Sequence, residues 1–341
     1  MRAGIIGTGA IARKHAQAFR NIGYGVVACA GIDAARGQKF GDQYGCEAFQ
    51  HWQDVCRHPE VELVDVCTFP DFRLEPVELG AREGKHVQVE KPIATNLGTA
   101  GAMLQAARER NIRLGVVSQH RFDDSIQFLK RAIIAGRLGR ILEADAYVKW
   151  YRTQEYYGRL MKGSWQTEGG GALINQAIHQ VDLLLWLAGP IQNVYGQWQI
   201  AAIHKMESED IVNAMVRYAS GATGVIQAAT AFEPGYPERL EIHGTGGTAI
   251  ITGDKLTTWD VRHDSGEEPP LSRALASGAS DPLAISLAPF ERQFLDFGEA
   301  IRCRRAPLVT GEEGFRALQV VDAIYRSCRE ERPVSLQDRA Y

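Results

Sequence analysis

A glycine-rich turn at residues 7–12, Gly-Thr-Gly-Ala-Ile-Ala, constrains the fold of this chain more than any other feature. It follows the apolar run Ala3–Ile6 and opens a helical pattern, which is the strand–turn–helix setting of a Gly-x-Gly-x-x-Ala motif. Gly7 permits the tight turn, Gly9 lets a pyrophosphate approach the backbone, and Ala12 lets the helix pack closely on the strand. Because helix amino ends favour anions, we expect this turn to bind a dinucleotide through Gly7, Thr8, Gly9, Ala10 and Ile11.

The first 120 residues alternate short apolar runs with helical patterns. The predicted strands are Ala3–Ile6, Gly25–Ala30, Leu63–Cys67, His86–Val89 and Leu114–Val117. The predicted helices are Ile11–Ile22, Ala34–Tyr44, Leu74–Glu83 and Leu97–Arg110. Strands that are apolar throughout are typical of a parallel sheet covered on both faces. We therefore predict an α/β chain in which residues 1–120 form a Rossmann dinucleotide-binding domain.

From residue 121 the pattern changes to strands separated by Gly, Ser and Pro turns. The predicted strands are Ile141–Tyr151, Val194–Ile203, Asp210–Tyr218, Thr223–Ala231, Arg239–Gly244 and Thr248–Thr252. The other predicted segments are a helix at Gly171–Ala188, a loop at Asp264–Pro289, and helices at Phe290–Arg302 and Glu312–Arg329. Because 341 residues exceed one compact core, we predict a second α/β domain over residues 121–341. Its C-terminal helices are free to pack back on the first domain.

Composition excludes several classes of partner. The chain carries 38 basic and 41 acidic residues, a balance that argues against nucleic-acid binding. No apolar run approaches the ~20 residues of a membrane helix, and the start of the chain lacks a signal-peptide pattern. The six cysteines are scattered, without a Cys-x-x-Cys pair or zinc spacing. We expect a cytoplasmic protein with reduced thiols, no metal site, and no nucleic-acid or membrane partner.

A dinucleotide-binding domain of this kind also places an acidic residue after its second strand, where it binds the ribose hydroxyls. Here that strand runs into Gly31-Ile32-Asp33, and the spacing from Gly9 makes Asp33 a candidate. Asp33 is equally suited to be the N-cap of the helix that begins at Ala34. Arg36 is close enough in sequence to reach a 2′-phosphate. The cofactor is therefore expected to be NAD or NADP, with a slight preference for NAD.

Several further motifs together resemble the glucose–fructose oxidoreductase / inositol dehydrogenase family (Gfo/Idh/MocA). The resemblance covers essentially the whole chain. Besides the glycine turn, its motifs are Val66-Cys67-Thr68, Gly84–Val87, Glu90-Lys91-Pro92, Gln119-His120-Arg121-Phe122, Gly169-Gly170-Gly171 through His179 to Asp182, and Ala323–Ser327. It implies a Rossmann domain plus an α/β domain built on a large, open, mostly antiparallel sheet, which commonly forms the oligomer interface. Members use NAD(P) to oxidise or reduce a carbon of a sugar or cyclitol.

The same resemblance implies roles for particular residues. Lys91 matches the lysine that contacts the reacting hydroxyl, and His179 matches the usual acid/base. Asn175 stands where many members carry aspartate. A subset of the family, which includes dehydrogenases of nucleotide-linked amino sugar acids, is similar to this chain in having Asn-Gln-x-x-His here. The usual acid is missing at Gly31, and a histidine often found near Arg73 is also missing. Because an amide cannot titrate, His179 and Lys91 remain as the proton-handling pair.

Physical chemistry gives an independent reason to single out these residues. Removing hydride from an alcohol carbon requires a base for the hydroxyl proton and alignment with the nicotinamide. Asn175, His179 and Asp182 fall at i, i+4 and i+7, so they share one helix face. Asp182 is positioned to orient His179 or raise its pKa. The structural alternative for His179 is a histidine buried in the core, and the structural alternative for Lys91 is a surface lysine. Further expected cofactor contacts are Thr68, Glu90, Lys91 and Gln119.

The segment from Trp150 to Trp165 is dense in aromatic and basic side chains. Aromatic rings pack against sugar CH faces, and Arg or Lys binds hydroxyls, carboxylates or phosphates. The alternative is a strand end and loop with some aromatic core residues. We predict substrate contacts at Arg121, Tyr151, Arg152, Tyr156, Lys162, Trp165 and Asn175.

These observations predict an NAD(P)-dependent oxidoreductase that acts on a CH–OH group of a sugar, cyclitol or sugar derivative. The basic segment favours an acidic or nucleotide-linked sugar. One alternative is a glycosidase that uses NAD for transient substrate oxidation, and another is a nucleotide-binding sensor without catalysis. The expected partners are the small-molecule substrate and further copies of the chain, as a homodimer or homotetramer through the C-terminal sheet.

Overall fold

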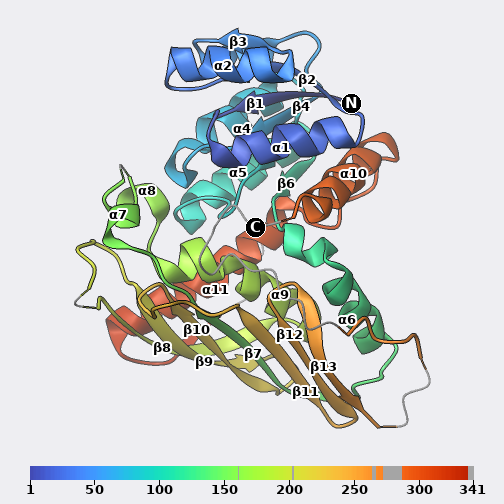
Figure 1. Ribbon diagram of the computed structural model, residues 1–341, viewed down its shortest axis with the longest axis vertical. Coiled ribbons are helices and arrows are strands. Elements are labelled where there is room, and N and C mark those ends of the chain that lie inside the picture. The colour runs from blue at the N-terminus through green and yellow to red at the C-terminus, as the bar shows by residue number, and fades with distance from the viewer. Residues whose placement is uncertain (160, 202, 263–265, 272–285, 337–341) are drawn as a thin grey trace. The chain divides into compact units, whose positions relative to one another are not determined.

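The computed structural model describes residues 1–159, 161–201, 203–262, 266–271 and 286–336. The chain divides into two compact units. The first unit comprises Met1–Gln119 and Ser286–Phe315, and the second comprises His120–Ile285 and Arg316–Tyr341. The first unit therefore includes a segment from near the end of the chain (Figure 1).

The first unit is built on a six-stranded sheet in the order β3-β2-β1-β4-β5-β6, in which all pairs are parallel. Its strands are β1 (Arg2–Ile6), β2 (Gly25–Ala30), β3 (Glu47–Phe49), β4 (Leu63–Val66), β5 (His86–Val89) and β6 (Leu114–Val116). Its helices are α1 (Ala10–Asn21), α2 (Ala34–Tyr44), α3 (Trp52–Arg57), α4 (Leu74–Arg82), α5 (Leu97–Glu109) and α10 (Ala288–Arg302), with a short 3-10 turn, η1 (Pro70–Phe72). This strand order confirms the Rossmann prediction.

Every strand and helix predicted for the first 120 residues is present, with ends that differ by no more than a residue or so. The sequence analysis missed β3 and α3, which are too short to show a clear period. The buried runs at Leu63–Val66 and Ala3–Ile6 explain why apolar continuity was a reliable signal. Both strands are central and covered on both faces.

Helix α10 packs against α1 within the first unit. The rings of Phe19 and Phe294 stack with centroids 4.4 Å apart, and Phe290 and Phe294 both contact the ring of His15. The amide of Gln293 bonds the backbone at Ser118 N (3.0 Å) and Val116 O (2.8 Å). The segment Ser286–Phe315 is thus part of the dinucleotide-binding unit.

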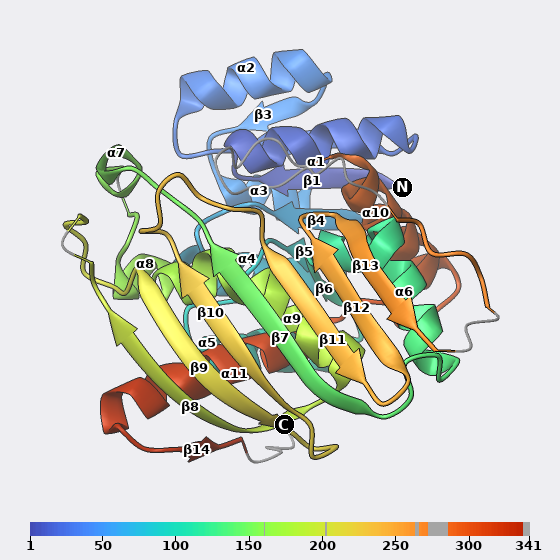
Figure 2. The same ribbon diagram turned by 60° about the horizontal axis from the view of Figure 1, so that its bottom comes forward.

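The second unit contains an eight-stranded sheet in the order β13-β12-β11-β7-β10-β9-β8-β14. Its strands are β7 (Ile141–Lys149), β8 (Ile191–Gln199), β9 (Ile211–Tyr218), β10 (Thr223–Ala229), β11 (Arg239–Gly244), β12 (Gly247–Thr252), β13 (Lys255–Val261) and β14 (Val334–Ser335). All pairs are antiparallel except β7 with β10. The large, mostly antiparallel sheet is therefore confirmed (Figure 2).

The helices of the second unit are less well predicted. They are α6 (Asp124–Ile134), α7 (Gln154–Tyr157), α8 (Trp165–Glu168), a π-helical turn η3 (Leu173–Ala177) and α9 (Ile178–Ala188), while α11 (Gly311–Glu330) runs through both units. The helices α6, α7 and α8 and the strands β13 and β14 were not predicted. The predicted strand Val194–Ile203 is β8, which lies earlier and ends at Gln199. Most of the predicted loop Asp264–Pro289 lies outside the described residues.

Within the described residues, every helix is either too short or too polar to cross a membrane.

Candidate active site

The glycine turn of the first unit has the geometry that its motif requires. Gly7 adopts a φ of 102°, and a side chain there would meet the carbonyl oxygen of Cys67 at 2.8 Å. The Gly7 amide donates to the carbonyl of Ala30 at 2.8 Å, which ties the turn between β1 and α1 to the end of β2. Gly9 is the N-cap of α1, and a Cβ placed there would meet nothing within 4 Å. The amino end of α1 is therefore open to an anion.

Asp33 serves as the N-cap of α2, one of its two predicted roles. Its carboxylate accepts a hydrogen bond from the Arg36 amide at 3.0 Å. Gly31 occupies the position where an acid is usual, and a Cβ there would lie 2.4 Å from the Thr8 hydroxyl oxygen. The side chain of Thr8 fills the space that a longer residue at position 31 would need. This contact gives a physical reason for the missing acid.

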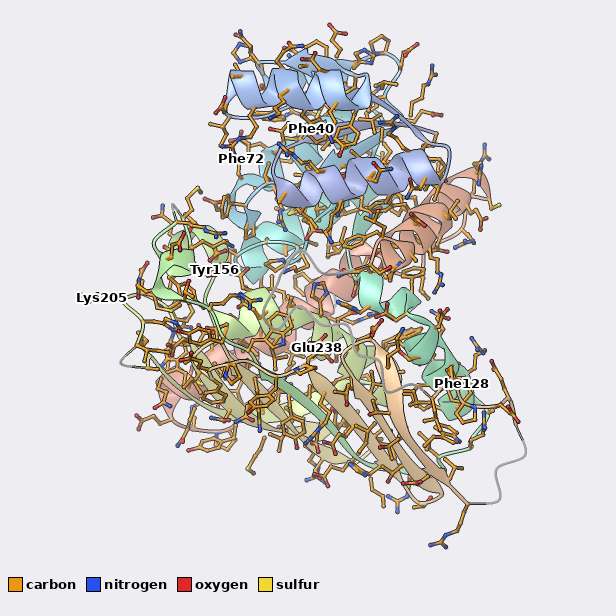
Figure 3. All side chains as sticks on the ribbon, viewed as in Figure 1. Phe40, Phe72, Phe128, Tyr156, Lys205 and Glu238 are labelled. Carbon is orange, nitrogen blue, oxygen red and sulfur yellow. The ribbon has the colours of Figure 1, made fainter. Side chains whose placement is uncertain are left out.

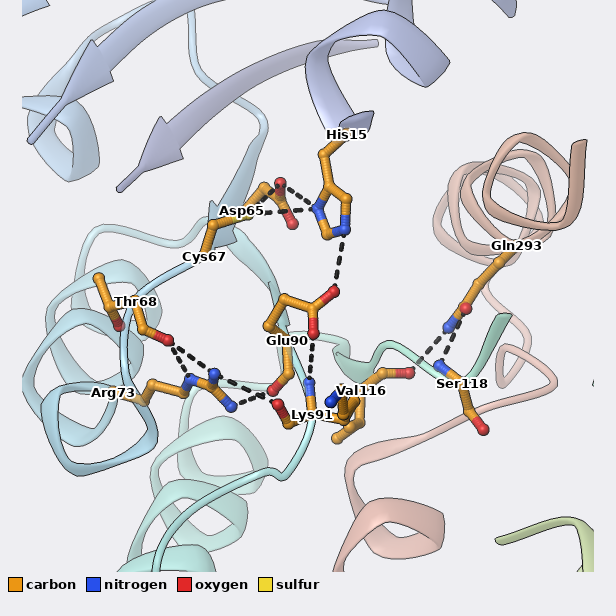
Figure 4. A network of polar contacts seen from close by, with 10 residues as sticks. All are labelled: His15, Asp65, Cys67, Thr68, Arg73, Glu90, Lys91, Val116, Ser118 and Gln293. Carbon is orange, nitrogen blue, oxygen red and sulfur yellow. Dashed lines mark hydrogen bonds and ion pairs between the residues drawn. The ribbon is translucent and has the colours of Figure 1, made fainter. Parts of the chain in front are cut away.

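Lys91 follows β5 in a short loop, residues 90–92, that we call the Lys91 loop (Figure 4). The Lys91 amide donates to the carboxylate of Glu90 at 3.0 Å. The guanidinium of Arg73 donates to the carbonyls of Glu90, Lys91 and Pro92 on one side and to that of Thr68 on the other. Arg73 is only 3% exposed, so this buried cation holds the backbone around Lys91 in one conformation.

His15 links helix α1 to the Lys91 loop. Its Nδ1 lies 2.8 Å from the carboxylate of Asp65, and its Nε2 lies 3.1 Å from that of Glu90. The thiol of Cys67 lies 3.3 Å from both His15 and Asp65. We call His15, Asp65, Glu90 and Arg73 the buried ion cluster. Possible metal-ligand atoms of His15, Asp65 and Cys67 also lie within 4.8 Å of one another, but each side chain already has a hydrogen-bonding partner there.

The charges of the buried ion cluster balance. Burial opposes the charged form of His15, but Cys67 and Asp65 outweigh it, so the pKa of His15 lies well above its ordinary value. Burial also opposes ionisation of Glu90, but hydrogen bonding from His15 outweighs it and the pKa of Glu90 is lowered. Burial lowers the pKa of Arg73 to about 10. The cluster thus pairs two buried cations with two acidic side chains in a site from which water is excluded.

Thr68 and Gln119, both predicted to contact the cofactor, lie at the carboxyl ends of β4 and β6. The Thr68 hydroxyl donates to the carbonyl of Phe72 at 3.1 Å. Gln119 is 2% exposed, and its side-chain oxygen lacks a partner among the described residues. An orphaned buried acceptor needs a donor. This acceptor, together with the open amino end of α1, fits the binding of a polar ligand such as NAD at this sheet edge.

In the second unit, a close fit of glycines positions the helix that carries the predicted catalytic histidine. A Cβ on Gly170 would lie 2.3 Å from the Tyr325 hydroxyl, and a Cβ on Gly171 would lie 1.8 Å from the carbonyl oxygen of Glu209. The Glu209 carboxylate accepts hydrogen bonds from Gly171 N (2.7 Å), Leu173 N (2.9 Å) and the Tyr325 hydroxyl (3.0 Å). Burial raises the pKa of Glu209 to about 7. A buried carboxyl group therefore caps the start of this helix.

Asn175 lies in the π-helical turn η3, and His179 and Asp182 lie in α9. The π-helical turn changes the predicted regular spacing between Asn175 and His179. Asp182 forms a two-point ion pair with Arg121, at 2.8 Å to Nε and 2.6 Å to Nη2. Arg121 is 1% exposed and lies over the ring of Trp186. This pair gives Asp182 and Arg121 a structural role, and their expected contacts with His179 and with substrate stay predictions.

The aromatic and basic segment gathers around Tyr156, whose side chain is drawn in Figure 3. The charged groups of Arg152, Arg159 and Lys162 lie 5.8, 5.6 and 5.4 Å from the centre of the Tyr156 ring. The Tyr156 hydroxyl accepts a hydrogen bond from Gln176 at 3.4 Å. Three cations thus surround one ring, next to the turn that carries Asn175.

The remaining predicted substrate residues lie in different surroundings. Tyr151 forms a backbone bridge with Ala231. Trp165 packs between the rings of Trp198 and Tyr325, at 5.1 and 5.0 Å, so it is part of an aromatic cluster. Lys162 forms an ion pair with the buried carboxylate of Glu168.

Four residues with evident roles around the site were not predicted: His15, Arg73, His120 and Glu209. His120 lies within the Gln119–Phe122 motif, and its ring contacts that of His179 with centroids 5.1 Å apart. Neither His15 nor Glu209 stands out in the sequence, because each has charged neighbours, Arg13 and Lys14 in one case and Glu207 and Asp210 in the other.

Comparison with known proteins identifies the family. Residues 1–118 match the family described as an oxidoreductase family with an NAD-binding Rossmann fold. Residues 126–250 match the Gfo/Idh/MocA C-terminal domain. Two families of the same group therefore account for both units.

Individual relatives cover nearly the whole chain. Myo-inositol 2-dehydrogenase of Thermotoga maritima is 25% identical over 99% of both chains. 1,5-Anhydro-D-fructose reductase of Ensifer adhaerens is 29% identical over 96% of both. The WlbA dehydrogenase of Bordetella pertussis, solved in complex with NADH and UDP-GlcNAcA, has a TM-score of 0.87 at 28% identity over 99% of each chain. The protein therefore belongs to the Gfo/Idh/MocA family of oxidoreductases with an NAD-binding Rossmann domain.

Proposed function

We propose that this protein is an NAD-dependent dehydrogenase or reductase. It moves hydride between the nicotinamide ring and a hydroxyl-bearing carbon of a sugar, a cyclitol or a sugar derivative. The names of its relatives, which are dehydrogenases and reductases, favour this function over a glycosidase or a sensor.

The observation that carries the proposal is the alignment of three strand ends in the first unit. Ile6 pairs with Val66, and Val66 pairs with Val89, so β1, β4 and β5 end at the same level of the parallel sheet. The glycine turn follows β1 and the Lys91 loop follows β5. Ligands of open α/β sheets bind outside the carboxyl ends of the strands, where the strand order reverses. Lys91 is therefore at the sheet edge that binds the dinucleotide.

NAD supplies the hydride acceptor at this edge when it is bound. Lys91, whose backbone is fixed by Glu90 and Arg73, stabilises negative charge on the substrate oxygen. His179 takes the hydroxyl proton in oxidation and returns it in reduction. Asn175, an amide at the position of the usual acid, holds the substrate by hydrogen bonding without exchanging a proton.

The basic surroundings of Tyr156 support an acidic sugar derivative as the substrate. Arg152, Arg159 and Lys162 provide three cations there, and Lys162 pairs with the carboxylate of Glu168. Guanidinium groups bind carboxylates and phosphates by paired hydrogen bonds. The similarity to a dehydrogenase solved with UDP-GlcNAcA favours the same class.

The test is NADH formation at 340 nm with NAD and a panel of cyclitols, neutral sugars, uronic acids and nucleotide-linked sugar acids. We expect turnover, with preference for acidic members, and a fall of about 10²-fold or more in Lys91→Ala and His179→Ala. The exposed Lys39→Ala and His51→Ala variants are matched controls that keep wild-type rates. Failure of the whole panel in both directions contradicts the proposal. Release of aglycone from a chromogenic glycoside without net NADH formation identifies the glycosidase instead.

We also propose that copies of the chain associate through the eight-stranded sheet. Figure 2 shows α9 against one face of the sheet and leaves the other face uncovered. On β9, alternate residues are exposed, and Met215 is 65% exposed. Because β9 lies inside the sheet, between β10 and β8, Met215 is available on this uncovered face to a second copy of the chain. Light scattering is expected to show a dimer or tetramer, and Met215→Glu is expected to shift it toward monomer.

A further inference from the structure

Two cysteines of the first unit lie next to each other. Cys29 lies in β2, and Cys46 immediately precedes β3, the parallel neighbour of β2. The register pairs Cys29 with Ala48, so Cys46, two residues earlier, falls on the same face of the strands as Cys29. The two thiols form a hydrogen bond with each other. Each sulfur atom is therefore within reach of the other.

Helix α2 packs against β2 and β3 (Figure 1). Its glycines let it approach the two cysteines closely. A Cβ on Gly41 would lie 2.8 Å from the carbonyl oxygen of Cys46, and the Cys46 amide donates to the Gly41 carbonyl at 3.1 Å. The sulfur of Cys29 lies 3.7 Å from the carbonyl oxygen of Gly37. The helix thus holds both cysteines in place from one side.

The two thiols differ in their access to solvent. Cys29 is 0% exposed, whereas Cys46 is partly exposed. The hydrogen bond with Cys29 lowers the pKa of Cys46 and outweighs burial, while the same bond, together with burial, raises the pKa of Cys29. Because the thiolate is the nucleophilic form of cysteine, Cys46 is the sulfur that reacts first with an oxidant.

Three other cysteines are shifted in the opposite direction. Burial raises the pKa of Cys56 and of Cys67 to about 12, and that of Cys328 to about 11. These thiols stay protonated at neutral pH and are poor nucleophiles. Cys46 differs from them because a neighbouring thiol stabilises its charge.

We propose that Cys46 and Cys29 form a peroxide-reactive pair that closes into an intrachain disulfide. The Cys46 thiolate attacks hydrogen peroxide, its sulfur takes one oxygen to become sulfenic acid, and hydroxide leaves. The Cys29 sulfur then attacks the Cys46 sulfur, so that the S–S bond forms, the S–O bond breaks, and water leaves with the Cys29 proton. The two thiols lose two electrons, and the peroxide is reduced to water.

The position of Cys29 makes this oxidation reversible. A sulfenic acid without a partner reacts with further peroxide to sulfinic and sulfonic acids, whereas a disulfide is reduced again by other thiols. The hydrogen bond to a Cys46 thiolate, burial and the charge of Cys46 raise the pKa of Cys29. The first and the last of these causes are lost when Cys46 becomes sulfenic acid, so Cys29 becomes more nucleophilic once Cys46 is oxidised.

The direct test is peptide mapping of the full-length protein after oxidation. Protein reduced with dithiothreitol and freed of reductant is treated with hydrogen peroxide, and the remaining thiols are blocked with N-ethylmaleimide under denaturing conditions. Digestion without reductant and mass spectrometry then identify the linked peptides. We expect Cys29 and Cys46 to lose their free thiols together and to appear as one linked pair, which dithiothreitol separates.

Recovery of both cysteines as maleimide adducts overturns the proposal, at a peroxide dose that fully oxidises free cysteine in a parallel sample. A disulfide that joins Cys46 to a different cysteine of the chain also overturns it. Because this test reads sulfur chemistry in the absence of substrate and NAD, its outcome is independent of the proposed function.

Two variants separate the roles of the two sulfur atoms. In Cys29→Ser, Cys46 has no partner thiol, so we expect sulfinic and sulfonic acid at Cys46. In Cys46→Ser, the buried Cys29 is expected to stay unoxidised, and oxidation of Cys29 to the wild-type extent would contradict the proposed order. Cys303→Ser, at an exposed position, is the matched control and keeps the linked pair. Circular dichroism identifies a variant that fails to fold, and the wild-type map, which needs no substitution, decides in that case.

Discussion

The two residues proposed to handle the substrate proton lie in contrasting surroundings. The Lys91 loop is fixed by a buried ion cluster in which His15, Glu90 and Arg73 contact one another or the loop backbone. His179 instead lies on a helix that begins at the carboxyl group of Glu209, with a pKa of about 7, and contacts His120. Lys91 is thus held by groups whose charge is constant near neutral pH. The helix of His179 begins at Glu209, a group that titrates there.

This difference suggests a division of roles. The first unit fixes geometry, because its ion cluster is sealed from water and keeps one charge state. The second unit responds to pH, because burial raises the pKa of Glu209 to about 7 and this group therefore changes charge near neutral pH. Removing a charge in the first unit should therefore cost stability, and titrating the second should change both stability and rate.

The largest expected effect on stability comes from removing His15, one of the two cations of the buried ion cluster. His15→Leu leaves Asp65 and Glu90 buried without their shared partner. We expect the free energy of unfolding to fall by about 3–5 kcal/mol, as measured by urea denaturation. The control His51→Leu, at an exposed position, should change it by less than about 0.5 kcal/mol. A loss below about 1 kcal/mol for His15→Leu would show that the cluster does not hold the first unit together.

The next effect tests the tight fit at the start of the His179 helix. In Gly171→Ala the new Cβ would lie 1.8 Å from the Glu209 carbonyl oxygen, so backbone must move. We expect a loss of about 2–4 kcal/mol in stability, with a lower kcat because η3 and α9 shift. Gly37→Ala in α2 is the matched control, since its Cβ would meet nothing within 4 Å. The control should be neutral or stabilising by about 0.5–1 kcal/mol. Equal effects of the two substitutions would contradict the packing argument.

The pH dependence of stability sharpens the contrast between the units. Burial raises the pKa of Glu209 to about 7, from an ordinary value of 4.5. The folded state therefore binds more protons than the unfolded state between these values, and stability falls as pH rises from about 4.5 to about 7. The contribution of Glu209 across this window is up to about 3 kcal/mol.

Glu209→Gln should abolish this part of the dependence, so the difference in stability between wild type and variant should change with pH across the same window. Thermal or urea unfolding at half-unit pH steps measures it. A difference that stays constant from pH 4.5 to 7 would mean that Glu209 does not titrate there.

The smallest expected effect concerns the cap of α2. Asp33→Ala removes the hydrogen bond to the Arg36 amide, and we expect a loss of about 1 kcal/mol in stability. Asp33→Ser keeps a capping side chain and should retain most of it. NAD affinity, measured by calorimetry, should be unchanged in both. A fall in affinity in both variants would assign Asp33 to the ribose as well as to the cap.

How far the sequence predicts this molecule differs between the two units. Apolar continuity predicted β1 and β4 because both are buried on both faces, and the glycine turn located the cofactor site. In the second unit, β13 is the last strand of the sheet and carries mostly half-exposed residues, so its pattern is weak. Short elements such as α7 depend on tertiary contacts and leave no period in the sequence.

The contacts that organise the site were harder to predict than its central residues. Arg73 binds backbone carbonyls. Every residue has such a carbonyl, so the sequence does not show which ones Arg73 binds. The pairing of Asp182 with Arg121 was not predicted, because a helix face shows which residues align but not what packs against them. The contacts of Trp165 with Trp198 and Tyr325 were likewise not predicted, and its contact with substrate stays a prediction.

The central claim is that Lys91 serves the reaction at a site already built to bind NAD. Lys91→Met tests it most directly, because methionine keeps the length of the side chain and removes its charge. We expect NAD affinity within about threefold of wild type, and turnover on the best substrate of the panel to fall by about 10²–10⁴-fold. Wild-type turnover in this variant, or a loss of turnover fully explained by a loss of NAD binding, would contradict the account.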